Sequence, residues 1–235
     1  MRFTLAAFIL ACLLLHTSTA GAQAVGNPVF SSYDFVLQAT LEYGSSDRDL
    51  DADRKDPEES TLDTLLLKVI LGVTPHLDLY FTVGQASFDL CTGDAQEICG
   101  KDGDLNGASD IAYGGGARWT FWDSQRLQAA VGVSTLLFSV SEEIQNTDVS
   151  VDWWEYEAFV GASYPGLRWG TPYGGISYSV VDGKFDGPNN VDLSEDKPVG
   201  AFVGIDIPWG NYFSVTAEGR FIDQTSWSIG INARY

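Results

Sequence analysis

Hydrophobic and polar side chains alternate one by one along most of the chain after its first 32 residues. The last ten residues show the pattern clearly, because every second side chain is apolar, namely Trp227, Ile229, Ile231, Ala233 and Tyr235. A β-strand sends successive side chains to opposite faces, so this stretch predicts a strand with one apolar and one polar face. The chain ends on an aromatic residue of the apolar face.

The same alternation predicts ten strands in total. Their expected ranges are 33–43, 61–74, 77–86, 110–121, 127–137, 154–164, 174–180, 199–207, 213–221 and 226–235. In the first of them, tyrosines stand at both ends of the apolar face, at Tyr33 and Tyr43. Aromatic side chains at both ends are typical of a strand that crosses a membrane, where they lie at the two interfaces. The length of this strand also matches the roughly 9–11 residues of a tilted spanning strand.

The connections between the expected strands alternate in length. Short turns are expected near Pro75, Ser124, Gly166 and Gly210, and long polar connections over residues 44–60, 89–108, 139–150 and 181–197. The connection near Asp223 lies on the side of the long connections but is itself short. Short turns at one edge and longer connections at the other are typical of outer-membrane barrels, whose strand number is even in bacterial single-chain examples. A soluble jelly roll or sandwich has no reason to alternate in this way.

With this ending and this repeated alternation, the chain resembles Gram-negative outer-membrane β-barrel proteins, in particular the small opacity-type and OmpA-like group. The resemblance implies an all-β fold, a single antiparallel transmembrane β-barrel of ten strands. Eight is the alternative count, if two of the weaker strands merge or lie outside the membrane. Closure requires the first strand, residues 33–43, to pair with the last strand, residues 226–235. An exported soluble β-sandwich is the competing fold.

The resemblance also implies a location and partners. The expected location is the cell outer membrane, in contact with lipid and lipopolysaccharide, and the expected oligomeric state is a monomer. In this family the terminal aromatic residue and the alternation before it are read by the barrel-insertion machinery. That signal corresponds here to Trp227, Ile229, Ile231, Ala233 and Tyr235.

The first 24 residues have the pattern of a secretory signal peptide. Arg2 precedes a short apolar run over residues 3–15, and a small-residue segment follows. An A-x-A site at residues 22–24 predicts cleavage before Val25, and a second such site at residues 20–22 is the alternative. The apolar run is too short to span a bilayer as a helix. The predicted organisation is therefore a signal peptide over residues 1–24 and a barrel domain over residues 25–235.

Charge and hydropathy exclude two classes of protein. The formal net charge is −19, from 13 basic and 32 acidic residues, so the chain repels nucleic acid and no nucleic-acid partner is expected. No later segment is apolar over the length of a spanning helix, which argues against a helical inner-membrane protein.

The polar face of each predicted strand points into the barrel and carries charged side chains. These are Asp34, Glu42, Lys68, Asp110, Arg118, Glu155, Glu157, Asp206, Glu218, Arg220 and Arg234. Charges inside a small barrel must pair or stay hydrated, because isolated burial is costly. One interpretation is an ion-paired plug that fills a narrow lumen, and it is the favoured one since about eight strands leave an interior just filled by side chains. The other is a thin aqueous path with an acidic lining that favours cations.

Catalytic chemistry is not expected. The enzymatic outer-membrane barrels rely on histidine, the side chain suited to proton transfer near neutral pH. Here His16 belongs to the predicted signal peptide and His76 to a turn beside Pro75. Glu155 and Glu157 are paired carboxylates, but on a barrel wall they are better interpreted as lumen charges.

Two cysteines fall in the second long connection. Cys91 and Cys99 lie eight positions apart, and in an exported protein such a pair indicates a disulfide rather than a metal site. Cys12 faintly resembles a lipoprotein box, but the apolar run continues past it and a better cleavage site follows.

A short acidic motif follows the cysteines. Asp102, Asp104 and Asn106 match the start of a calcium-binding loop, D-x-D-x-N-G. Position twelve of such a loop is Tyr113 and not the bidentate glutamate, so an EF-hand is excluded. Weak calcium binding and an ordinary turn remain alternatives, and no other cofactor is expected.

The sequence therefore predicts an integral outer-membrane barrel with a structural or narrow-pore role. The alternative function is a surface adhesion or ligand-binding barrel that acts through its long external loops.

Overall fold

The computed structural model describes residues 25–26, 37–52, 58–90, 105–144, 147–186, 191–195 and 197–235. This part of the chain forms eleven β-strands. Within it, no helix has the length and apolar character needed to cross a membrane. The strands are β1 (Leu37–Ala52), β2 (Glu58–Thr74), β3 (Leu77–Leu90), β4 (Leu105–Asp123), β5 (Gln128–Ile144), β6 (Thr147–Ser163), β7 (Thr171–Asp186), β8 (Val191–Glu195), β9 (Val199–Trp209), β10 (Phe213–Phe221) and β11 (Gln224–Arg234).

Ten of these strands form a closed antiparallel barrel. Neighbours follow the order β11-β10-β9-β7-β6-β5-β4-β3-β2-β1, and β1 pairs with β11 to close the ring. The closing ladder runs from the pair Gln38–Arg234 to the pair Arg48–Gln224. Beyond it, the backbone N–H of Tyr235 donates to the carbonyl of Leu37 at 3.0 Å. The predicted ten-strand barrel and the predicted pairing of first and last strands are confirmed.

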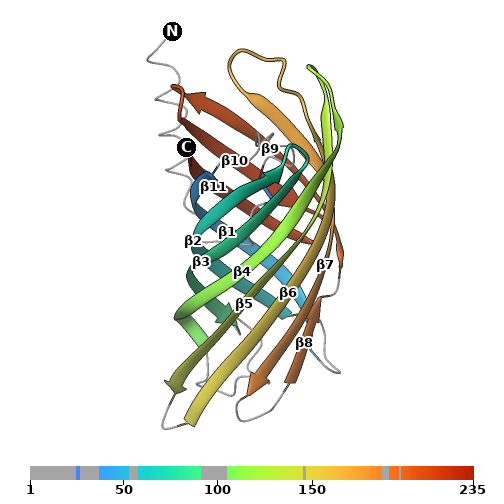
Figure 1. Cartoon of the computed structure of the whole chain (residues 1–235). Helices are drawn as coiled ribbons and strands as arrows, with labels where there is room; N and C mark the ends of the chain where they lie inside the picture. The colour runs from blue at the N-terminus through green and yellow to red at the C-terminus, as the bar shows by residue number, and fades with distance from the viewer. Residues whose placement is uncertain are drawn as a thin grey trace, which may run out of the picture.

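Strand β8 is an additional element that the sequence pattern did not predict. It pairs with β7 on one side and with β1 on the other. Strands β1 to β7 are 14–19 residues long, whereas β9, β10 and β11 have 11, 9 and 11 residues. Figure 1 shows β9–β11 at the end where the C-terminus lies and β8 at the opposite end. The wall therefore has ten strands near the C-terminus and narrows to eight, β1–β8, at the far end.

Large apolar side chains cover the outside of the ten-strand section. Phe81, Ile111 and Val133 expose 55%, 65% and 55% of their surface, and similar residues follow the outward parity of the other spanning strands. Exposure of such a surface to water is unfavourable, whereas lipid solvates it. The closed ring also leaves no edge strand with unpaired backbone groups in the lipid. The competing soluble sandwich is wrong, because it would bury this face. The chain folds as a closed β-barrel whose apolar outside suits a lipid environment.

Three of the four expected long connections are shorter than the sequence predicts. Residues 139–150 were expected to be a loop, yet β5 and β6 leave only two positions between Ile144 and Thr147. Most of the expected loops 44–60 and 181–197 is likewise strand, whereas most of 89–108 lies outside the described residues. In the section beyond the lipid, polar side chains face outward and apolar side chains face inward. For example, Asp152 is exposed, whereas Val151 and Trp153 are buried inside. Backbone pairing continues there although the lipid-facing pattern has ended.

The closing ladder can be tested by cross-linking. Ser46 in β1 faces Ser226 in β11, and facing residues of antiparallel strands lie about 4.5–5.5 Å apart at Cα, within disulfide range. In a chain with Cys91 and Cys99 replaced by serine, we expect Ser46→Cys with Ser226→Cys to form a disulfide on mild oxidation. Non-reducing gels and peptide mass spectrometry would detect it. The pair Ser46→Cys with Ser141→Cys, on β1 and β5, is the control and should stay reduced; equal cross-linking of both pairs would contradict closure.

Candidate functional site

The interior of the barrel holds the candidate site, and its outer end is filled by apolar side chains. Sixteen buried residues from β1–β8 pack together there: Leu50, Leu62, Leu66, Ala86, Phe88, Ala108, Ala112, Leu136, Phe138, Val140, Val149, Val151, Trp153, Val181, Phe185 and Leu193. The ring centroids of Phe88 and Phe138 lie 5.4 and 5.7 Å from that of Trp153. We refer to these sixteen residues as the outer apolar cluster. An eight-stranded wall encloses just the volume that side chains fill, which is what this cluster does.

A charged network lies directly beneath the outer apolar cluster and spans the lumen. Arg48 reaches from β1 to β6, where its Nη2 donates to Glu155 Oε1 at 2.8 Å. The same nitrogen donates to Gln224 Oε1 at 2.7 Å, at the start of β11. The guanidinium carbon of Arg48 also lies 6.0 Å from the ring centroid of Trp153. Arg48 thus connects β1 with its neighbour β11 and with β6, which adjoins neither of them. It also connects the charged network to the aromatic side chains of the outer apolar cluster.

Arg220 makes a second bridge across the lumen. From β10 it donates to Glu157 on β6 at 2.9 Å and to Ser177 on β7 at 2.9 Å. The turn after β10 places Asp223 inside the wall, where it is buried. The Asp223 carboxylate lies against Gly200, which has no room for a Cβ atom. The tip of the short β10–β11 hairpin therefore contributes directly to the charged network.

Three further ion pairs lie in the ten-strand section. Lys68 Nζ is 3.3 Å from Glu42, Arg118 Nε is 2.8 Å from Asp78, and Arg234 Nη2 is 3.2 Å from Asp206. Most of these side chains are buried, so their charges need these partners. The first two pairs connect neighbouring strands, and the third connects β11 to β9 across β10. All three neutralise part of the lumen charge.

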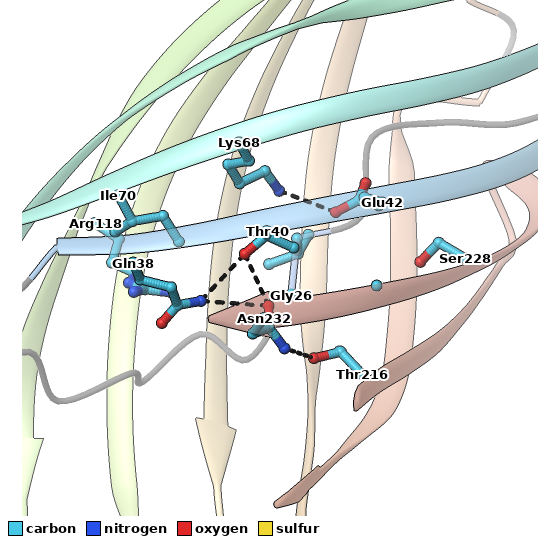
Figure 2. Close-up of a pocket in the computed structure, with 12 residues that line it drawn as sticks. Gly26, Gln38, Thr40, Glu42, Lys68, Ile70, Arg118, Thr216, Ser228 and Asn232 are labelled. Atoms are coloured by element: carbon cyan, nitrogen blue, oxygen red, sulfur yellow. Dashed lines mark hydrogen bonds and ion pairs between the residues drawn. The ribbon is translucent and has the colours of Figure 1, made fainter. Parts of the chain in front are cut away.

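A small polar cavity lies beside the Glu42–Lys68 pair. Figure 2 shows Asn232 at its floor, linked to Gln38, Thr40 and Thr216 by hydrogen bonds; the bond from Thr40 is 2.8 Å long and that to Thr216 is 2.7 Å. The cavity volume is about 30 Å³. That is close to the volume of a single water molecule in the liquid. It does not form a channel of solute size.

All seven charged residues that the sequence placed in the lumen as site candidates are buried inside the barrel. They are Lys68, Arg118, Glu155, Glu157, Asp206, Glu218 and Arg220. Asp110 is an exception to the wider expectation of inward charges, because its side chain is exposed. Its carboxylate accepts the backbone N–H of Ile111 at 2.7 Å, a local bond that holds it against its own strand.

Several other predicted residues lie outside the described part of the chain. These are Asp34, the cysteines Cys91 and Cys99, and the calcium-motif residues Asp102 and Asp104. Asn106 lies near the start of β4. Among the described residues, no group of three or more His, Cys, Asp or Glu side chains is arranged to hold a metal ion.

The predicted insertion-signal residues lie on the outside of β11 and just after it. Trp227, Ile229 and Ile231 are exposed to the lipid side, Ala233 is half-buried, and Tyr235 follows the last strand residue with 81% of its surface exposed. The ring of Trp227 packs on that of Tyr43 across the closing ladder, at 5.6 Å between centroids. The aromatic pair therefore covers the seam from the membrane side.

Several residues of this interior lie where the alternation predicts no strand. Glu195, whose Oε1 lies 3.7 Å from Arg48 Nε, falls with Arg48 in the predicted loops, and Trp153 falls beside the start of a predicted strand. The sequence contains a sign of this packed interior, because consecutive apolar residues such as Leu65-Leu-Leu67 and Trp153-Trp154 make both faces of a strand apolar. Such runs indicate a strand with lipid on one side and a packed interior on the other.

Comparisons with known proteins give fold-level likenesses only. No protein-family model matches the chain. No curated protein matches it either. Among solved structures, an outer membrane channel from Pseudomonas putida F1 is 11% identical with a TM-score of 0.47, over 94% of this chain and 100% of that one.

Two other solved structures are similar to a comparable degree. Ail, the attachment invasion locus protein of Yersinia pestis, is 10% identical over 86% of this chain and 99% of its own, with a TM-score of 0.43. The translocator domain of the autotransporter NalP from Neisseria meningitidis is 12% identical over 87% and 89%, with a TM-score of 0.47. At these identities and scores, the similarity assigns no activity, ligand or partner to this chain.

The bridge between Arg48 and Glu155 can be tested by a double-mutant cycle. Removing one partner of a buried ion pair leaves the other uncompensated, so we expect Arg48→Met or Glu155→Gln to lower the free energy of unfolding by about 3–5 kcal/mol. The double variant should lose clearly less than the sum of the two single losses. Urea unfolding in lipid vesicles, followed by tryptophan fluorescence, would measure this.

The exposed pair Lys184–Asp186, 3.0 Å long, is the matched control. Lys184→Met should leave the free energy of unfolding nearly unchanged, because solvent screens an exposed pair. Strict additivity of the Arg48 and Glu155 losses would show that the two side chains do not interact.

Proposed function

We propose that this protein is a structural, non-catalytic outer-membrane barrel with a sealed lumen, which holds a rigid extension of its wall outside the membrane. The observation that carries this function is the outer apolar cluster. It fills the eight-stranded section, and its members expose no more than 8% of their surface. An ion that passed through this section would lose its hydration among apolar side chains, which costs far more than thermal energy.

The charged network supports the same function. Arg48 and Arg220 cross the lumen and bind glutamates of β6, so they occupy the space that a pore would need. These bridges connect distant parts of the wall and resist its deformation. The extension is the eight-stranded section of the wall, formed by β8 and the ends of β1–β7 next to it. It is part of a continuous sheet, since β8 pairs with both β7 and β1.

Planar-bilayer recording tests the sealed lumen. We expect purified protein, inserted into a planar lipid bilayer in 1 M potassium chloride, to give no conductance steps above background. An open porin recorded in the same bilayers would show that the measurement detects pores, and protease protection in matched vesicles would show that the protein is inserted. Reproducible steps from folded protein would overturn the sealed lumen and support the narrow-pore alternative.

A second function, binding at the cell surface, is favoured by the charge of the extension. Its outward face carries Asp63, Asp152, Asp182 and Asp192 beyond the lipid-facing residues of the strands. Carboxylates on a rigid sheet form a fixed acidic surface that suits a cationic partner. The strong net negative charge of the chain, −19, acts in the same direction.

Attachment to a cationic coating tests this second function. Cells that display the protein should bind a poly-L-lysine surface, and Asp63→Asn, Asp182→Asn and Asp192→Asn together should reduce the bound fraction, with the difference lost at high salt. The control replaces Ser87, Ser109 and Ser139, neutral residues of the same end, by asparagine. Equal attachment of both variants, at equal surface levels, would remove the acidic face as the binding surface.

A further inference from the structure

Residues Val25 and Gly26 lie inside the barrel and bind one carboxylate. The backbone nitrogen of Val25 is 3.0 Å from Glu218 Oε1, and that of Gly26 is 2.9 Å from Glu218 Oε2. Glu218 lies on β10 and points into the lumen, where it is 5% exposed. Figure 2 shows Gly26 in the lumen beside Thr40 and Asn232. Both oxygens of a buried carboxylate are thus directed at the chain segment that precedes the first strand.

The side chain of Val25 has an apolar seat of its own. It packs against the cluster of Phe159, Tyr173 and Phe202. The hydroxyl of Tyr173 donates to Glu218 Oε2 at 3.1 Å, so the aromatic seat and the carboxylate belong to one site. The site therefore recognises a small apolar side chain and the nitrogen next to it.

The charges of the lumen call for a further cation. Among the described residues, the buried carboxylates outnumber the buried cations. The acidic side chains are Glu42, Asp78, Glu155, Glu157, Asp206, Glu218 and Asp223, and the basic ones are Arg48, Lys68, Arg118 and Arg220. An uncompensated buried carboxylate is costly, and an ammonium group bound to it removes most of that cost.

The predicted signal-peptide cleavage creates such a cation at this place. The A-x-A site at residues 22–24 predicts cleavage before Val25. Hydrolysis of that bond by a signal peptidase adds water across it, leaving a carboxylate on Ala24 and an amine on Val25. At neutral pH an α-amino group is largely protonated, so a neutral amide with one hydrogen becomes an ammonium with three.

We propose that Val25 is the N-terminal residue of the mature protein and that its α-ammonium group occupies a dedicated site formed by Glu218, Tyr173 and the aromatic seat. The contact is charge-assisted only after processing, so the barrel gains stability when the signal peptide is removed. The inference rests on the predicted cleavage position and not on the sealed lumen. The small polar cavity beside Val25 and Gly26 has room for about one water that solvates the remaining ammonium hydrogens.

Mass spectrometry and amine labelling test the site on protein purified from outer membranes. The intact mass should correspond to a chain that starts at Val25. In the folded barrel the α-amine should resist reductive methylation with formaldehyde and cyanoborohydride, and it should react fully after unfolding in urea. Lys184, with 54% of its side chain exposed, is the internal positive control. A chain that starts at residue 23, or an α-amine that reacts as fast as Lys184, would overturn the proposal.

Variants separate this role from general stability. Glu218→Gln removes the ion pair that holds the α-ammonium group, so methylation of the folded α-amine should become at least about tenfold faster, which corresponds to about 1.4 kcal/mol. Glu155→Gln, which breaks the buried pair with Arg48 away from this cavity, is the matched control and should leave the α-amine protected. If Glu218→Gln does not fold, Val25→Gly removes the contact with the seat and should likewise expose the amine.

An insertion tests the dependence on the terminus itself. Asparagine and glutamine placed between Ala24 and Val25 create no new A-x-A site, so they should give a longer mature chain whose ammonium no longer reaches Glu218. We expect a lower unfolding midpoint in vesicles, and no further decrease when the insertion is combined with Glu218→Gln. An unchanged midpoint, or fully additive losses, would overturn the proposal.

Discussion

The constraint on which this structure depends is that no backbone N–H or carbonyl group can remain unpaired in lipid. It requires the first and last strands to meet, and the β1–β11 ladder meets this requirement over eleven residue pairs. Once the ring is closed, each strand has one face toward lipid and one toward the lumen. Tyr43 and Trp227 then pack together on the outside of the seam, while Thr40 and Asn232 bond to each other on its inside. The division into two chemically opposite surfaces follows from closure.

The change from ten strands to eight explains how the interior is filled. The β10–β11 hairpin ends part-way along the wall, and β8 replaces it between β7 and β1. The narrower section is packed with apolar side chains, and the wider one keeps polar and charged groups. The boundary lies where the hairpin tip brings Asp223 and Gln224 into the wall, next to Arg48 and Arg220. The charged network is therefore placed at the step in strand number.

Buried ion pairs contribute little net stability, but they specify which partners meet. Arg48 binds Glu155 and Arg220 binds Glu157, so both arginines connect to β6 from strands that do not adjoin it. Hydrophobic packing alone would allow these strands to shift by two residues without changing which face is apolar. The charges oppose such a shift because each displaced arginine would leave a glutamate unpaired. A terminal ammonium on Glu218 would extend the same principle to the start of the mature chain.

The parts of the fold that depend on a local period can be predicted from the amino-acid sequence. Alternation placed Trp227 and Ile231 outside and Lys68 and Glu157 inside, since each side chain's face follows from its neighbours along one strand. The pattern is set by contact with lipid, and it ends where the membrane ends. For that reason the alternation predicts loops at Arg48 and Glu195.

The contacts of these inward residues follow from the closed barrel and not from the local pattern. The partner of Arg48 is 107 positions away, and that of Arg220 is 63 positions away. The distance between them depends on strand order, register and the number of strands at that height, none of which a local period contains. The binding of Val25 to Glu218 has the same origin, because it spans 193 positions and exists only in the closed ring.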